Sequence, residues 1–266
     1  MQRLPQDELR QCLSLVRKDE PIDNQQSGKN RLPLFEGKMI WQFDHQHGEA
    51  KYGIDEKEAR NILVGARKRD TGQLLDYQDY RYGFREIASR TNERGLIAII
   101  LPQRVFANHK LMISTSRAKI SKTELVFCCA VTNSFAFDFL VRQRTSTTIS
   151  MFTFYQLPVP RLTTTDAAFA PIVQRAAQLI CTTPEFDALA KEVSTALKLP
   201  LSAVKGVTEE TKRAKLRAEL DGLIAHLYAL TESEFTHILN TFPLVSEPVK
   251  MAAQNAYRDA QQGMIK

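Results

Sequence analysis

The chain has 266 residues, of which 43% are apolar and 25% charged, a balance that excludes wholesale disorder and fibrous repeats. This length accommodates one sizeable domain together with a smaller one. Four cysteines without a C-x-x-C pair and the polar start MQRLPQDELRQCL predict reduced thiols, no disulfide, no secretion signal and a cytoplasmic location. No apolar run approaches the roughly 20 residues of a membrane span, so no membrane partner is expected.

The positive charge is concentrated in the first part of the chain. Residues 1–160 carry 24 Lys and Arg against 18 Asp and Glu, whereas residues 161–266 carry 12 of each, and the net charge is +6. Residues 81–145 alone hold 11 basic and 4 acidic side chains. Such a patch suits a phosphate backbone, although an ordinary solvated face explains the composition about equally well.

The first part of the chain is typical of a mixture of strands and helices. Residues 1–31 are expected to form an amphipathic helix and a polar linker, and residues 32–45 a strand interrupted by a turn at Glu36-Gly37. The basic segment 57–70 has helical spacing but contains Gly65, which indicates a weak helix or a lid-like loop.

Residues 80–88 fit both a strand and a helix, and their aromatic enrichment favours a strand. In that strand, Arg81 and Arg85 lie on the face opposite the aromatic side chains, and residues 89–95 connect tightly to a buried strand at 96–101. Residues 123–144 are predicted to form one buried helix, and residues 151–160 another strand.

A boundary is expected at Pro158 and Pro160, because proline cannot donate to a sheet ladder. Helical spacing follows at 166–181, 184–198, 208–230 and 232–242. The start signals are Thr183 or Pro184, Thr208 and Thr231. The sequence therefore predicts an α+β fold in which a mixed-sheet domain over residues 32–160 precedes a helical domain over residues 161–266.

Recognised catalytic motifs are absent from the sequence. It has no glycine-rich phosphate loop, no H-E-x-x-H and no G-x-S-x-G, so no catalytic residue is assigned. The cluster Asp44, His45, His47 and Glu49 leaves open a metal-dependent nuclease. No convincing further ligand follows it at a suitable spacing, so no metal is expected.

Four segments occur in the order in which a known family has them. They are LPLFEGKMIWQFDH (32–45), YRYGFREIASRTNERGLIAIILP (80–102), AVTNSFAFDFLVRQR (130–144) with FTFYQLPVP (152–160), and RAELDGLIAHLYALTESEFTHILNTFP (217–243). Together they resemble the C-terminal target-recognition region of large adenine-specific DNA methyltransferases of single-chain restriction-modification and phage-defence systems. The similarity spans residues 32–260, nearly the whole chain.

The resemblance implies that another domain or subunit performs the chemistry. In that family an upstream domain binds S-adenosylmethionine and holds the flipped adenine with an Asn/Asp-Pro-Pro-aromatic motif, and this sequence has neither that motif nor the cofactor loop. The chain is thus expected to hold no cofactor and to recognise double-stranded DNA for an associated methyltransferase or restriction subunit. The segments RTSTTIS and QRVFANHK depart from the family pattern, so the DNA site read by the family is not transferable.

The candidate DNA contacts are cations, hydroxyls and one amide within these segments. Arginine can bind guanine or phosphate with two hydrogen bonds, asparagine can pair with adenine, and phosphate contacts are the commoner kind. Internal ion pairs are the competing interpretation for Arg85 and Arg94. A flexible surface loop is the competing interpretation for Arg142 and residues 144–148. The predicted DNA-binding residues are Lys38, Arg81, Arg85, Arg90, Asn92, Arg94, Arg142, Arg144, Thr145 and Thr147, with Ser146 and Thr148 beside them.

The alternative function is an interaction subunit. In that hypothesis the helical unit docks a methyltransferase or a translocase, and the chain has little affinity of its own for DNA. The apolar positions Leu220, Leu223, Ile224, Leu227 and Leu230 recur at helical spacing and are expected to pack against other helices or such a partner.

Overall fold

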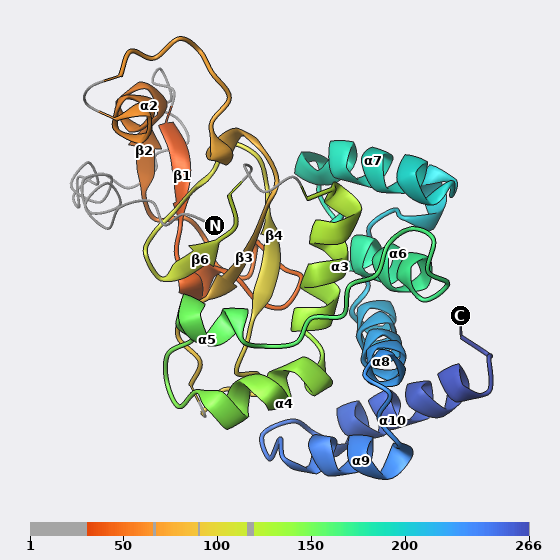
Figure 1. Ribbon diagram of the computed structural model, residues 1–266. Coiled ribbons are helices and arrows are strands. Elements are labelled where there is room, and N and C mark those ends of the chain that lie inside the picture. Colours follow the sequence, from red (N-terminus) through yellow and green to blue (C-terminus); the bar gives the residue numbers. More distant parts are fainter. Residues whose placement is uncertain (1–30, 66–67, 90, 116–119, 266) are drawn as a thin grey trace.

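The computed structural model describes residues 31–65, 68–89, 91–115 and 120–265. The helix expected before residue 31, like Arg90, lies outside the described residues. Two small sheets are followed by an array of helices, so the predicted α+β fold with a C-terminal helical part is confirmed (Figure 1).

The first sheet has the order β2-β1-β5 and supports helix α2. β1 (Arg31–Phe35) pairs antiparallel with β2 (Gly53–Asp55) and parallel with β5 (Phe106–Ala107). α2 (Glu56–Val64) begins where the Asp55 carboxylate accepts a hydrogen bond from the Glu58 amide at 3.0 Å. It ends before Gly65, whose φ of 92° a residue with a side chain rarely adopts. Of the two structures expected for 57–70, a weak helix or a lid-like loop, the helix is present, but it ends at Val64.

The second sheet has the order β4-β3-β6, and both faces of its central strand are covered. β3 (Arg81–Arg85) pairs antiparallel with β4 (Ala98–Leu101) and with β6 (Leu111–Ile113). The strands expected at 80–88 and 96–101 are confirmed, whereas β5 and β6 were not expected. Tyr82 and Phe84 pack in the main core with α3, and the other face of the sheet meets the apolar cluster of Met39 and Ile40.

The long apolar segment 123–144 is two helices, so the prediction of a single helix is wrong. α3 (Lys122–Thr132) and α4 (Phe135–Arg144) meet at an angle of 67°. The break has a local cause. The Ser134 hydroxyl caps α4, and the side-chain amide of Asn133 both accepts a hydrogen bond from the Ala98 amide and donates one to the Ala98 carbonyl. Among the described residues no single helix has the length and apolar character of a membrane span, and this bent pair meets that test by length and composition alone.

The strand expected at 151–160 is also wrong, because its first half is the short helix α5 (Met151–Tyr155). The Ser150 hydroxyl accepts a hydrogen bond from the Thr153 amide and starts the helix. Phe154 then points inward and stacks on Phe84, with 4.6 Å between the ring centroids. The Phe154 ring also contacts the rings of Tyr82 and Phe137, so the segment meets the core as a helix and not as a strand.

The remaining helices form the C-terminal part of the chain. α6 packs against α3, whose other neighbour is β4, and α8 crosses α10 (Figure 1). The crossing is close at Gly222, because a Cβ there would lie 2.6 Å from the backbone of α10. The helix α10 was not expected. The elements not yet given are η1 (Gly37–Met39), η2 (Asp76–Gln78), α6 (Phe169–Ile180), η3 (Pro184–Phe186), α7 (Asp187–Leu197), η4 (Leu201–Ala203), α8 (Glu210–Leu227), α9 (Glu232–Asn240) and α10 (Glu247–Gln261).

Candidate nucleic-acid interface

Arg81, predicted to contact DNA, lies in the protein interior. Its residue is 3% exposed, and its Nη2 donates a hydrogen bond to the Val105 carbonyl. Burial lowers the pKa of its guanidinium to about 10, against the weak opposing effect of Asp76 and Asp79. The prediction is wrong because it treated the face of β3 opposite the aromatic residues as open, whereas a second apolar cluster covers that face.

Arg94 is also buried, so its predicted contact with DNA is wrong. Its Cζ lies 3.4 Å from the centroid of the Phe135 ring, and its Nη2 lies 3.4 Å from Oδ2 of the buried Asp221. The other oxygen of Asp221 accepts a hydrogen bond from the Phe135 amide. The competing interpretation of an internal ion pair was therefore correct, but the partner is 127 residues away and belongs to α8.

Two further arginines of the set are half-buried and bind backbone carbonyls. Arg85 donates to the carbonyl of Ile40 and lies over the Trp41 ring, 5.4 Å from its centroid. Arg142 donates to the carbonyls of Asn92 and Glu93 at 3.1 and 2.9 Å. These guanidinium groups hold the chain around the second sheet, which leaves them little capacity for a ligand. Asn92 itself is half-buried in the segment that Arg142 braces.

Lys38, Arg144, Thr145 and Thr147 lie at or near the surface. The side chain of Lys38 is 63% exposed and pairs with Glu36 at 2.9 Å. Arg144 ends α4 and donates to the amide oxygen of Gln156 at 3.1 Å, which leaves most of its guanidinium toward solvent. Thr147 is exposed and Thr145 half-buried.

The backbone joins the segment after α4 to the end of β3. The Ala88 amide donates to the Thr147 carbonyl at 2.9 Å, and the Ile149 amide donates to the Glu86 carbonyl at 2.8 Å. Ile87 and Thr148 face each other in an antiparallel bridge, so their side chains share one face. That face is open, because Ile87 is 49% exposed.

Helix α5 follows Thr148 closely in the sequence and exposes aromatic side chains of its own. Since Phe154 is fixed inward, Phe152 and Tyr155 point outward and are 74% and 57% exposed. We call the set of Ile87, Arg144, Thr147, Thr148, Phe152 and Tyr155 the α5 surface.

Two lysines extend the α5 surface along the adjoining edge of the second sheet. The Glu86 amide donates to the Lys110 carbonyl at 2.9 Å, and the Lys110 ammonium lies 3.2 Å from the Glu86 carboxylate. η1 carries Lys38 and lies beside Lys110, because a Cβ on Gly37 would be 3.5 Å from the Lys110 carbonyl oxygen. Sequence reasoning missed Ile87, Lys110, Phe152 and Tyr155. The helical start signal at Ser150 was the one available indication that Phe152 faces outward.

The acidic and histidine cluster at 44–49 has no metal-site geometry. His45 is buried with its ring edge against Phe186 at 5.0 Å, whereas His47 stacks on Trp41. Burial lowers the pKa of His45, and the nearby Glu185 opposes that shift. Across the described parts of the chain, no three His, Cys, Asp or Glu side chains gather as metal ligands would.

No known protein family model matches the sequence, and no curated protein matches it either. The likeness to methyltransferase target-recognition regions therefore stays a prediction, and the assignment of a function depends on the surface chemistry.

Proposed function

We propose that this chain recognises double-stranded DNA on behalf of an adenine-specific methyltransferase or restriction enzyme, whose catalytic part binds S-adenosylmethionine. The observation that carries the proposal is the α5 surface. It combines an exposed guanidinium, two exposed threonine residues and exposed apolar side chains, with Lys38 and Lys110 beside it.

The charged, hydroxyl and apolar groups of the α5 surface match different parts of a DNA duplex. Arg144 and the two lysines suit phosphate oxygens, which receive most protein–DNA hydrogen bonds. The hydroxyls of Thr147 and Thr148 suit phosphate or base edges, and their methyl groups suit the methyl group of thymine. Ile87 and Phe152 can contact sugars or the edges of bases. The ordered family segments and the excess of positive charge in residues 1–160 also support the proposal.

A salt titration with a fluorescent duplex tests the proposal. Binding measured by anisotropy should weaken linearly in log–log form with a slope of about −0.9 for each neutralised phosphate. The double variant K38S/R144S should then have a slope shallower by about 2 units than the wild type, because two phosphate contacts are lost.

The matched control is K212S/K215S on α8, which removes the same charge from side chains that are 68% and 78% exposed. It should keep the wild-type slope. No duplex binding at low salt, or equal slopes for both double variants, would contradict the proposal.

The interaction-subunit alternative has its own supporting observation. Apolar side chains are exposed where α9 leads into α10, with Leu244 at 49%, Val249 at 46% and Met251 at 60%. A chain without duplex affinity would favour this function. A purified methyltransferase subunit that binds the wild type but not L244S/M251S would then support it.

A further inference from the structure

A second exposed segment lies at the far end of the first sheet, away from the α5 surface. Residues 68–75 precede η2, and Figure 1 shows them arching over α2 at the edge of the molecule. Leu74 is 86% exposed, more than any other large apolar side chain among the described residues. Lys68, Arg69 and Gln73 are exposed as well.

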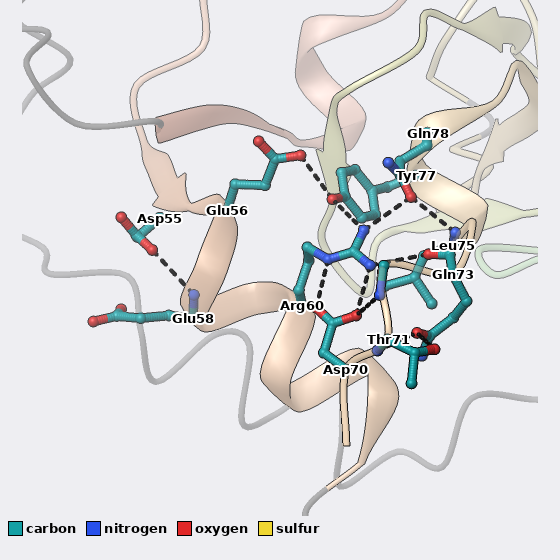
Figure 2. A network of polar contacts seen from close by, with 11 residues as sticks. Asp55, Glu56, Glu58, Arg60, Asp70, Thr71, Gln73, Leu75, Tyr77 and Gln78 are labelled. Carbon is teal, nitrogen blue, oxygen red and sulfur yellow. Dashed lines mark hydrogen bonds and ion pairs between the residues drawn. The ribbon is translucent and has the colours of Figure 1, made fainter. Parts of the chain in front are cut away.

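This segment is held in place by Arg60 of α2 (Figure 2). Nε and Nη2 of Arg60 bind the two carboxylate oxygens of Asp70 at 2.7 and 2.8 Å. Nη2 also donates to the Gln73 carbonyl, and Nη1 donates to the side chains of Tyr77 and Gln78. All five N–H groups of the guanidinium are thus used within the protein, so Arg60 is a brace and not a ligand-binding group.

The turn between Asp70 and Gln73 is fixed by further hydrogen bonds. The Gly72 amide donates to Asp70 at 2.9 Å, and the amide and hydroxyl of Thr71 donate to the side-chain oxygen of Gln73. Gly72 has a φ of 78°, which suits glycine. The Arg60 guanidinium lowers the pKa of Asp70 to about 2, so the carboxylate keeps its charge and the brace persists at physiological pH.

The same network positions a second loop, residues 102–105. The Tyr77 hydroxyl donates to Oε1 of the buried Glu56 at 2.7 Å, and Arg104 donates to Oε2 of Glu56 at 2.8 Å. The Arg104 amide donates to the Tyr77 carbonyl at 2.7 Å. Arg104 nevertheless keeps 53% of its side chain exposed. Both loops are therefore fixed relative to α2 by one set of polar contacts.

We propose that these two loops form a second, pre-organised contact surface for duplex DNA, an inference that rests on the proposed function. We call it the α2 surface, and its members are Lys68, Arg69, Gln73, Leu74 and Arg104. The two carboxylates closest to it in the network, Asp70 and Glu56, are already neutralised by Arg60 and Arg104. Among the described residues, no carboxylate forms an ion pair with Lys68 or Arg69, and their positive charge suits a polyanion.

The members of the α2 surface have distinct roles in this proposal. Lys68, Arg69 and Arg104 take phosphates, and the amide nitrogen of Gln73 reaches a base edge. Leu74 enters a groove, where apolar side chains can contact or wedge between bases. Arg60 is a positioning residue, because it holds the loop in a binding-ready conformation and so removes the cost of ordering it on binding.

Binding and proteolysis of the full chain test the proposal together, with an arbitrary fluorescent duplex as the probe. Duplex DNA should protect the peptide bonds after Lys68 and Arg69 from trypsin. K68S/R69S should flatten the salt slope by about 2 units relative to the wild type and to the control K212S/K215S. L74S should weaken binding without changing that slope.

The variant R60Q/D70N tests the brace separately from charge, because it removes one positive and one negative group. It should weaken duplex binding by roughly tenfold, the equivalent of ordering about one residue on binding. It should also speed tryptic cleavage after Arg69 in the absence of DNA. Unchanged affinity for R60Q/D70N would overturn the role of Arg60.

The possible failures are distinguishable. A wild type that binds no duplex sinks the proposed function and this inference with it. A wild type that binds and is weakened by K38S/R144S, but gives no tryptic protection and no effect of K68S/R69S, overturns the α2 surface alone. Loop variants that lose a purified protein partner while keeping DNA affinity also overturn it and make the α2 surface a protein-docking site.

Discussion

Replacing Arg94 with methionine removes one partner of a buried ion pair and leaves the other charged. Methionine fills much of the space over the Phe135 ring, so the main loss is electrostatic. Removing one member of such a pair typically costs about 3–5 kcal/mol, because the remaining charge stays buried without compensation. For a chain of this size, 3 kcal/mol corresponds to a fall in Tm of roughly 6–12 °C.

The substitution D221N removes the negative charge of Asp221 and keeps an oxygen that can accept the hydrogen bond of the Phe135 amide. The double variant R94M/D221N therefore lacks the unpaired charge. Its destabilisation should be less than the sum of the single effects by about 1–3 kcal/mol, the coupling expected of neighbours in one network. Urea unfolding of all four proteins measures this directly.

The destabilisation of R94M should shrink in acid. Burial raises the pKa of Asp221, and Arg94 opposes that shift, so R94M should raise this pKa further. A carboxyl group whose pKa is higher in the folded state than in the unfolded state destabilises the fold while it is ionised. This destabilisation is lost as the pH falls through the folded-state pKa, because the carboxyl group is then protonated. A stability of R94M within about 0.5 kcal/mol of the wild type, as for a surface substitution, would refute this account of Arg94.

Two further predictions concern packing. Burial lowers the pKa of His45 below its ordinary value of 6.5. As the pH falls below 6.5, the imidazole is therefore protonated in the unfolded chain before it is protonated in the folded protein, and the free energy of unfolding should decrease. H45Q should lessen this slope, by up to about 1.4 kcal/mol per pH unit, in urea unfolding between about pH 7 and 5. G222A should destabilise by about 1–3 kcal/mol in thermal unfolding, because its Cβ would lie 2.6 Å from the backbone of α10. A gain of stability, usual for glycine to alanine within a helix, would contradict that packing.

The sequence predicted the class of fold and most regular elements, because periodicity reports local structure directly. It could not predict what covers the second face of a strand. The alternation of Tyr82 and Phe84 with Arg81 and Arg85 correctly indicated β3. The same alternation fits a strand whose arginine face is exposed to solvent and one whose arginine face is covered by other residues. Covering that face requires Met39 and Ile40, more than 40 positions earlier, and no local pattern links them to β3.

The candidate site was harder to predict for the same reason. Arg94 finds its partner in Asp221, and this pairing depends on α8 docking against α4. The errors at α4 and α5 were avoidable, because Ser134 and Ser150 both stand as helix caps within segments assigned to other elements. Arg60 contacts Asp70 and Gln73, which are only 10 and 13 residues away in the sequence. These contacts were still not predicted, because an arginine–carboxylate pair in a loop produces no periodic pattern in the sequence.

The salt dependence of duplex binding should show whether the α5 and α2 surfaces act on one DNA molecule. Together with the lysines beside the α5 surface, they offer six cations, namely Lys38, Lys68, Arg69, Arg104, Lys110 and Arg144. A duplex that meets all six should give a log–log slope near −5, whereas one that meets either group of three should give a slope of about −3.

The double variants K38S/R144S and K68S/R69S resolve the two cases. If one duplex spans both surfaces, each variant should flatten the slope by about 2 units, and the combined variant by about 4. If only one surface binds DNA, one variant should behave as the wild type and the combined variant as the other. A slope unaffected by every variant would place the DNA contact outside both surfaces and away from Arg81 and Arg94, which are buried.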